Sequence, residues 1–197
     1  MEAKQLKELL LQSLEHERGG IKIYETALKC VQNDDLKEEF EKYHQETERH
    51  VEVLRDVFAQ MQLDPEEQTP GRKIVRDLGQ ALVAAMESAL GAGDPAAAEI
   101  VACECVTIAE LKDHLDWELL SEAAKKVGGA EGKALKEACA EVEEQEDEHY
   151  YHSRGWTREL WMDCLGMKAV LPPPEERKHV KTAIGAARAE QERSRMR

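Results

Sequence analysis

The feature that most constrains this chain is an apolar helical stripe that also carries an acid and an imidazole. In the run CAEVEEQEDEHYYHSRGW, Glu146 and His149 are three residues apart, so on an α-helix they lie one above the other on one face. The rest of that face is mostly apolar and carries Leu135, Ala138, Val142, Ser153, Trp156 and Leu160. Burying a carboxylate or an imidazolium without a partner costs several kcal/mol. The stripe therefore predicts a buried helix face on which two polar side chains need partners.

A divalent cation is the partner that suits both groups. Glu-x-x-His on a bundle helix is the spacing found in di-iron and di-manganese carboxylate proteins. Carboxylate oxygens combined with imidazole nitrogens suit iron or manganese, whereas thiolates favour zinc or copper. The motif predicts a metal centre if other helices supply the remaining ligands.

Three other segments with helical periodicity carry an acid or an imidazole within or beside their apolar stripe. They are residues 4–32 with Glu17, residues 35–62 with Glu46 and His50, and residues 95–127 with Glu110. Each of these residues is near the middle of its segment. If the segments pack side by side with the Glu146 helix, over residues 133–165, all six residues meet at mid-bundle.

Turn signals and one long connection predict the fold. Asn33-Asp34-Asp35 and the glycine-rich residues 128–132 are short turns, which make the helices on either side antiparallel neighbours. The two hairpins are joined through LDPEEQTPG, which breaks the helix, and a further helical segment over residues 72–90. We expect an all-α fold, a four-helix bundle with one long crossover that carries an extra helix.

The segment after the bundle has a different composition. Leu171-Pro172-Pro173-Pro174 stops any helix, and residues 175–197 carry seven Lys or Arg against four Glu. We therefore expect a bundle domain over residues 1–166 and a basic, Pro-interrupted arm over residues 167–197. The composition favours a solvated or partly helical arm, and an arm that docks on another subunit or contacts phosphate is the alternative.

Charge and composition exclude several classes of protein. A formal net charge of -14 argues against nucleic acid as the partner and fits a protein that attracts cations. The sequence has no run of eighteen apolar residues and no signal-peptide pattern, so we expect no membrane span and a cytoplasmic location. The five cysteines include no Cys-x-x-Cys pair and are expected to be buried thiols. We expect His16, His44, His152 and His179 at the surface.

Over residues 4–165 the chain resembles the ferritin-like superfamily. It looks most similar to the bacterial, largely uncharacterised branch of stress-associated ferritin-like proteins. The segment HQETERHVEVLRDVFAQM is similar to the second helix of that branch, and a helical insert before the third long helix is a further shared feature. The resemblance implies a ferritin-like four-helix bundle.

The same resemblance implies roles for individual residues. Glu17 and Glu110 match the acids of the first and third helices, and Glu146 with His149 matches the fourth-helix motif. In the second helix Thr47 stands where the family has an acid before His50. The Glu-Thr pair of the branch points to Glu46 as the substitute.

These expectations lead to one main hypothesis and two alternatives. The main hypothesis is a di-metal centre of two iron or manganese ions with ferroxidase or peroxide-handling activity in stress defence, in a dimer or larger assembly. Its proposed ligands, with Glu46 or Glu110 as the bridge, are Glu17, Glu46, His50, Glu110, Glu146 and His149. The first alternative is a metal-free or single-metal bundle that acts as a binding or oligomerisation scaffold. The second is a scaffold that works through its crossover helix and basic arm.

Overall fold

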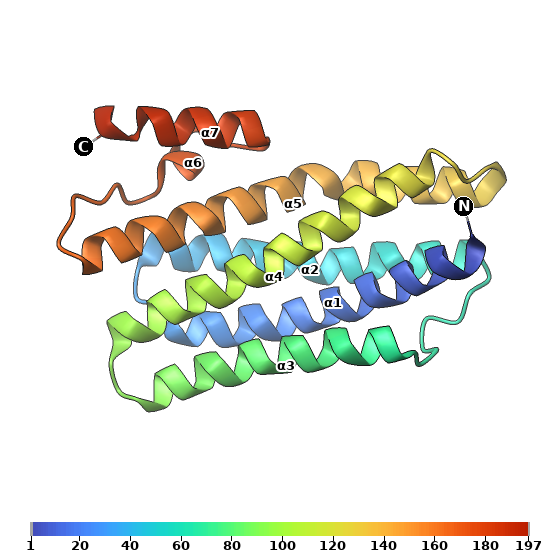
Figure 1. Cartoon of the computed structure of the whole chain (residues 1–197), viewed down its shortest axis with the longest axis horizontal. Helices are drawn as coiled ribbons and strands as arrows, with labels where there is room; N and C mark the ends of the chain where they lie inside the picture. Colours follow the sequence, from blue (N-terminus) through green and yellow to red (C-terminus); the bar gives the residue numbers. More distant parts are fainter. Residues whose placement is uncertain (1, 197) are drawn as a thin grey trace.

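The protein is all-α in the computed structural model, which describes residues 2–196 (Figure 1). The long helices are α1 (Ala3–Cys30), α2 (Asp34–Gln60), α3 (Pro70–Gly91), α4 (Pro95–Ala124) and α5 (Gly129–Cys164). The shorter elements that follow are α6 (Pro174–Arg177), α7 (Ala183–Glu192) and a 3-10 turn over Arg193–Arg195. No β-strand occurs between residues 2 and 196, and none of the helices there is long and apolar enough to cross a membrane.

Local sequence signals explain where the helices begin. Asn33, Thr69 and Asp94 precede α2, α3 and α4, and each side chain accepts a hydrogen bond from a backbone N–H of the first helical turn. Pro70 and Pro95 stand at the first positions of α3 and α4, where the missing N–H of proline costs nothing. All five long helices begin and end within four residues of the ranges expected from periodicity.

Four of the long helices form a bundle. α1 packs against α2 and α4, and α5 packs against α4 and α2, so the four helices close into a ring. The turns between α1 and α2 and between α4 and α5 are short, and each joins antiparallel neighbours (Figure 1). The chain returns along α3 between α2 and α4, so these two helices run in the same direction. The expected all-α bundle is confirmed.

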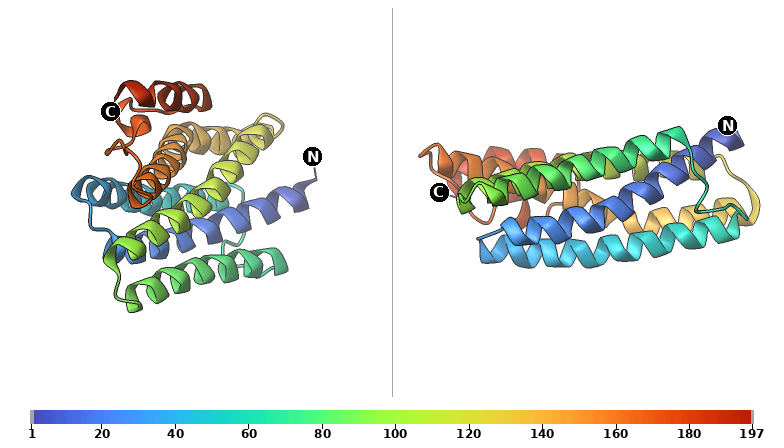
Figure 2. Two further views of the ribbon diagram at one scale, coloured as in Figure 1. Left: turned by 60° about the vertical axis from the view of Figure 1, so that its left-hand side comes forward. Right: turned by 90° about the horizontal axis from the view of Figure 1, so that it is seen from below.

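The crossover helix α3 lies outside the bundle against α1 and α4 (Figure 2). Its Gly79 faces Gly19 of α1, and a Cβ atom placed on Gly79 would lie 3.8 Å from the Gly19 Cα. On α1, a Cβ on Gly20 would lie 3.1 Å from Thr47 Cγ2 of α2. The Gly19-Gly20 pair costs helix stability but lets two neighbouring helices come close to α1.

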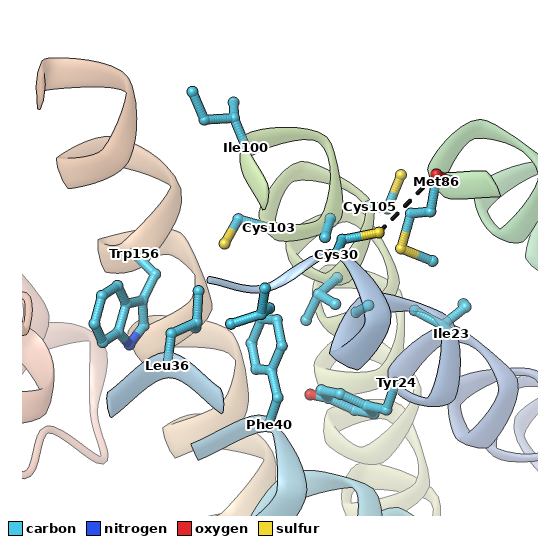
Figure 3. Close-up of a cluster of buried hydrophobic side chains, with 14 of the residues drawn as sticks. Ile23, Tyr24, Cys30, Leu36, Phe40, Met86, Ile100, Cys103, Cys105 and Trp156 are labelled. Carbon is cyan, nitrogen blue, oxygen red and sulfur yellow. Dashed lines mark hydrogen bonds between the residues drawn. The ribbon is translucent and has the colours of Figure 1, made fainter. Parts of the chain in front are cut away.

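Two apolar clusters fill the bundle on either side of its middle. One contains Tyr24, Phe40 and Trp156 together with buried cysteines (Figure 3). The other contains leucines and valines of α1, α2 and α5 packed around Trp117 of α4. Four of the five cysteines are buried free thiols, as expected, and Cys164 is exposed. The polar residues of the central layer are therefore enclosed by apolar packing.

The C-terminal arm packs on α5, on the opposite side of the molecule from α3 (Figure 1). Arg193 is buried and its guanidinium contacts both carboxylate oxygens of Glu159. Arg158 pairs with Glu175 through two hydrogen bonds of 2.8 Å. The arm is partly helical, as expected, but these ion pairs and its buried apolar residues attach it to the bundle instead of leaving it solvated.

Candidate metal centre

The bundle brings all six residues proposed as ligands to its middle. Glu17 comes from α1, Glu46 and His50 from α2, Glu110 from α4, and Glu146 and His149 from α5. All are buried except Glu46, whose side chain is 20% exposed. The residues that helical spacing predicted at or beside the inward helix faces therefore lie in one layer across the middle of the bundle.

Five of these residues form two groups with the geometry of a metal site. In each group one ligand atom per residue lies within 4.8 Å of the others. The first group is Glu17, His50 and Glu146, and the second is Glu110, Glu146 and His149. Glu146 belongs to both groups, so its carboxylate lies between them.

The two histidines have the same orientation. His50 Nδ1 lies 2.9 Å from Glu146 Oε1 and 3.6 Å from Glu17 Oε1, while its Nε2 donates to Gln145 Oε1 at 2.8 Å. His149 Nδ1 lies 3.6 Å from both Glu110 Oε2 and Glu146 Oε1. The outer nitrogen of each ring is held by an acceptor, which leaves Nδ1 to face the centre.

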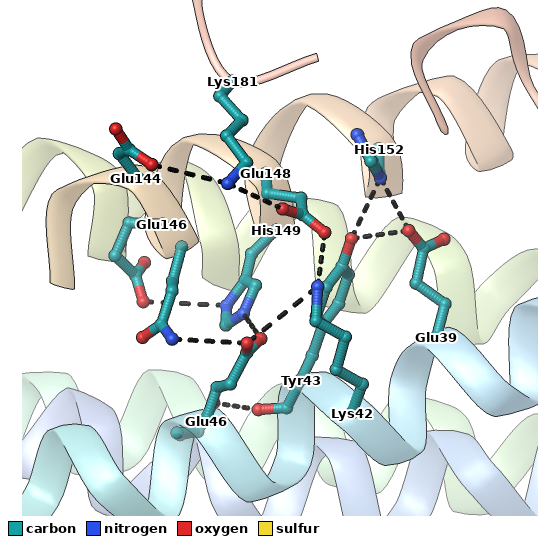
Figure 4. Close-up of polar contacts among 12 residues, drawn as sticks. Glu39, Lys42, Tyr43, Glu46, Glu144, Glu146, Glu148, His149, His152 and Lys181 are labelled. Atoms are coloured by element: carbon teal, nitrogen blue, oxygen red, sulfur yellow. Dashed lines mark hydrogen bonds and ion pairs between the residues drawn. The ribbon is translucent and has the colours of Figure 1, made fainter. Parts of the chain in front are cut away.

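Glu46 has a different position from the other acids. It accepts a hydrogen bond of 2.8 Å from His149 Nε2, on the side of the ring that faces away from the centre (Figure 4). The groups of possible ligands found among residues 2–196 do not include it. Thr47, the next residue, donates its hydroxyl to the Tyr43 carbonyl of its own helix. The second helix therefore directs only His50 at the two ligand groups.

Several polar atoms in this layer are buried without a hydrogen-bond partner. They are Glu17 Oε2, His50 Nδ1, Glu110 Oε2, both carboxylate oxygens of Glu146, and His149 Nδ1. Among them, His50 Nδ1 and Glu146 Oε1 contact each other at 2.9 Å as an ion pair and not as a hydrogen bond. Between residues 2 and 196, no lysine or arginine forms an ion pair with these three glutamates. Buried polar groups in proteins are nearly always satisfied, so this set needs an explanation. Oxygen and imidazole donors that converge in this way fit a divalent cation.

Burial and neighbouring charges shift the pKa values of the central residues. Burial raises the pKa of Glu146 to about 7. Burial alone would lower the pKa of His149, but the neighbouring carboxylates of Glu110 and Glu46 raise it to about 9. The pKa of His50 is also raised, because Glu17 and Glu146 outweigh its burial. Protons therefore neutralise part of the layer at neutral pH, and a bound cation would have to displace them.

Two aromatic residues connect the acids of the neighbouring helices α1 and α4. Tyr24, seven residues after Glu17, donates its hydroxyl to Glu110 at 2.7 Å. Trp117, seven residues after Glu110, donates its indole N–H to Glu17 at 2.8 Å. The repeated spacing in the sequence thus corresponds to a reciprocal pair of contacts. Both aromatics pack in the core, and each also orients one acid.

Sequence reasoning did not find some of the polar residues near the centre. Asp113 is buried, and its pKa is raised by burial and by Glu146, Glu17 and Glu110. It follows Glu110 by three residues, the same spacing that identified His149, so the signal was present. His16 and His152, expected at the surface, are buried. His16 Nε2 lies 2.9 Å from the Ala109 carbonyl oxygen of α4, and His152 is covered by the arm, where its Nε2 lies 3.1 Å from the Val180 carbonyl oxygen.

A comparison with family models matched residues 3–151 to the family described as "Domain of unknown function (DUF892)". Comparisons with curated proteins and with solved structures found no match. The family match covers most of the chain, including all six candidate ligands, and DUF892 is a member of the ferritin-like superfamily. The chain therefore belongs to the DUF892 family.

Proposed function

We propose that the protein binds two divalent cations in the middle of its bundle. The observation that supports the proposal is the convergence of buried carboxylate and imidazole atoms that have no hydrogen-bond partner. The donors are hard oxygens and imidazole nitrogens, so iron and manganese are the metals that they suit.

Each residue has a specific role in this proposal. Glu17 and His50 hold one ion, Glu110 and His149 hold the other, and Glu146 bridges the two. We place the bridge at Glu146, and not at Glu46 or Glu110 as the sequence suggested, because only Glu146 belongs to both ligand groups. Glu46 would then orient His149 through the ring nitrogen that faces away from the ions.

A ferritin-like arrangement of the bundle is part of the same proposal. Two antiparallel hairpins, joined by a long connection with its own helix, are the arrangement of ferritin-like bundles. Glu-x-x-His on α5 and single acids on α1 and α4 are consistent with it. The stress-associated branch is proposed on the similarity of the second helix alone.

We further propose ferroxidase or peroxide-handling activity in stress defence. Iron or manganese bound here would supply the redox chemistry. The protein's own residues would enclose the site in apolar packing, neutralise the ions with Glu17, Glu110 and Glu146, and release protons from His50 and His149 during metal uptake. Tyr24 and Trp117 would hold the acids in place.

A metal-free or single-metal scaffold is the second candidate function, and two observations favour it. Thr47 removes the second-helix acid, so the centre has one bridging carboxylate instead of two. In addition, the 2.9 Å contact between His50 and Glu146 already neutralises part of the layer by an ion pair. In this case the bundle would serve as a binding or oligomerisation module.

We expect the protein to form a dimer or larger assembly. Four apolar residues on α4 are at least 44% exposed and lie at steps of three and four residues, on one helix face: Ile108, Leu111, Leu115 and Leu119. Exposed apolar stripes of this kind mark association surfaces. Mass measurement by light scattering tests this expectation. A cytoplasmic location and the absence of a nucleic-acid partner remain predictions from the sequence.

Metal content decides between the two functions. Protein purified without chelator is loaded anaerobically with Fe(II), beside the variant Glu146→Ala/His149→Ala and the control Glu144→Ala, which removes an exposed acid of the same helix. Two ions lost in the variant and retained in the control would support the di-metal proposal. Oxygen and peroxide consumption by the loaded protein would then test the activity. One central ion would support a single-metal site, and none would leave the bundle as a scaffold.

A further inference from the structure

A third histidine, His152, repeats the arrangement of the two central histidines one turn further along α5. Its Nε2 lies 3.1 Å from the Val180 carbonyl oxygen, and its Nδ1 lies 2.6 Å from Glu39 Oε1 (Figure 4). As at His50 and His149, one ring nitrogen is held by an outer acceptor and the other faces a carboxylate. Glu39, Glu148 and His152 each place a ligand atom within 4.8 Å of the others.

The contacts of His152 fix where its protons must be. A backbone carbonyl only accepts, so Nε2 carries a hydrogen. Nδ1 contacts Glu39 Oε1 at 2.6 Å and the Tyr43 hydroxyl at 3.1 Å, and a cation coordinated by Nδ1 would replace these contacts. A carbonyl that fixes the imidazole tautomer is the usual support of a metal-binding histidine.

Glu39 has three hydrogen-bond partners, Tyr43, His152 and Trp156, and a second carboxyl group also lies against it. Glu176 of the arm faces Glu39, and its Oε2 is shielded from solvent without a hydrogen-bond partner. Lys42 and Lys181 contact Glu148, but between residues 2 and 196 neither Glu39 nor Glu176 pairs with a lysine or arginine. Two carboxyl groups that meet in this way need a shared proton or a cation.

We propose that Glu39, Glu148 and His152 form a separate divalent-cation site, with Glu176 as an additional carboxylate from the arm. The ligands come from α2, α5 and α6, so a bound ion would fasten the arm to the bundle. The donors are again oxygens and one imidazole, which suit manganese, iron or zinc. Tyr43 connects this site to the centre, because its ring packs on His149 with centroids 4.1 Å apart and its hydroxyl donates to Glu39 at 2.6 Å. The site goes beyond the central di-metal proposal and does not depend on it.

Manganese binding in protein without the central ligands tests this site alone. The full-length chain with Glu146→Ala/His149→Ala is titrated with Mn²⁺, and the free hydrated ion is counted by electron paramagnetic resonance. We expect one bound equivalent. Adding Glu148→Gln/Glu176→Gln should weaken binding at least tenfold, whereas the control Glu144→Gln removes one charge from an exposed acid beside Lys181 and should leave it unchanged.

The outcomes separate the outer site from the centre. No Mn²⁺ bound by the Glu146→Ala/His149→Ala protein would mean that Glu39 and Glu176 share a proton, and the proposal would be wrong. Equal affinity with and without Glu148→Gln/Glu176→Gln would also overturn it. Neither result bears on the central proposal, which is tested by Fe(II) content in protein that retains Glu146 and His149.

A second measurement applies if the Glu146→Ala/His149→Ala protein does not fold. In the parent background, Glu148→Gln/Glu176→Gln should bind one Mn²⁺ fewer than Glu144→Gln, and equal numbers would overturn the site. The ion should also slow amide hydrogen exchange in α7, because it fastens the arm. This protection should be lost in Glu148→Gln/Glu176→Gln and kept in the control.

Discussion

Two buried acids on α1, only two residues apart, have opposite surroundings. Glu15 faces α3, where its Oε2 accepts from Arg72 at 2.6 Å and its Oε1 accepts from Arg76 at 2.5 Å. Burial would raise its pKa, but the two arginines lower the pKa to about 2. Glu17 faces the centre, where Trp117 satisfies one oxygen and the other has no hydrogen-bond partner.

The difference shows how this protein treats buried charge. At two acids that join elements, Glu15 between α1 and α3 and Glu159 between α5 and the arm, an arginine neutralises the charge permanently. In the central layer, the acids face imidazoles, one another and the aromatic donors Tyr24 and Trp117, and within residues 2–196 none of them pairs with an arginine. A guanidinium neutralises a buried acid with a charge that is part of the chain. A layer of acids without a guanidinium can instead be neutralised by an exchangeable cation.

The largest expected effect comes from removing the arginine partner of Glu15. Arg72 is 1% exposed, so Arg72→Met should lower the free energy of unfolding by about 3–5 kcal/mol, as expected when one partner of a buried ion pair is lost. Lys73→Met is the matched control, because its pair with Asp77 is exposed and should contribute less than about 1 kcal/mol. Denaturant unfolding measures both. Equal losses would contradict a structural role for the Glu15 pair.

Metal binding should affect variants of the two acids of α1 differently. Saturating Mn²⁺ at about 100 times its Kd should add about 2.7 kcal/mol to the free energy of unfolding for each ion bound. Glu17→Gln should lose most of this gain but stay within about 1 kcal/mol of the parent without metal, because it relieves repulsion among the central acids. Glu15→Gln should destabilise the metal-free protein and keep the gain. If both variants kept the gain, Glu17 would not be a ligand.

The reciprocal aromatic contacts should affect affinity more than stoichiometry. Tyr24→Phe and Trp117→Phe each remove one hydrogen bond to a central acid, and loss of such an outer contact typically costs about 10–100-fold in metal affinity. Mn²⁺ titration measures the effect. Tyr150→Phe is the control, because that ring stacks on His114 and lies on the outer part of α5. Unchanged affinity in both aromatic variants would limit them to core packing.

The two types of acid should also respond to pH in opposite directions. The folded-state pKa of Glu15, about 2, lies below its ordinary value of 4.5, so its contribution to stability is present above pH 4.5 and is lost as the pH falls toward 2. The pKa of Glu146, about 7, lies above 4.5, so its contribution is present below pH 4.5 and is lost as the pH rises through 7.

Unfolding of chelator-treated protein over this pH range measures both contributions. Arg72→Met should reduce the loss of unfolding free energy as the pH falls toward 2. Glu146→Gln should reduce the loss of unfolding free energy as the pH rises toward 7. Saturating metal should reduce the loss of stability toward neutral pH, because metal binding displaces protons and strengthens as the pH rises. If Glu146→Gln left the loss of stability toward neutral pH unchanged, the Glu146 carboxyl would not be the group that controls this loss.

Much of the bundle and its polar layer could be predicted from the sequence, because both follow from one periodicity. Glu17, Glu110, Glu146 and His149 interrupt apolar stripes, and an interruption of this kind can be recognised without knowing which helix lies opposite. The caps at Asn33, Thr69 and Asp94 are equally local signals. The metal roles of these residues remain predictions.

The positions that were not predicted depend on contacts between distant parts of the chain. α3 covers the outer face of α1, so Glu15, outside the stripe that faces the ring, is buried there by Arg72 and Arg76. The arm covers α5 in the same way and buries His152 and Glu159. A four-helix pattern assigns these faces to solvent, because nothing in their local spacing shows that a fifth helix and an arm will cover them.

The position of α1 against three other helices has a consequence for the order of synthesis. The chain emerges from the ribosome N-terminus first, so α1 and α2 are available before any other helix. The partners of α1, Arg72 for Glu15 and Trp117 for Glu17, are translated only with α3 and α4. An early α1–α2 hairpin would leave Glu15 and Glu17 exposed, because burying either carboxylate without its partner is too costly. The helix that is made first is therefore expected to be enclosed only after α3 and α4 have been made.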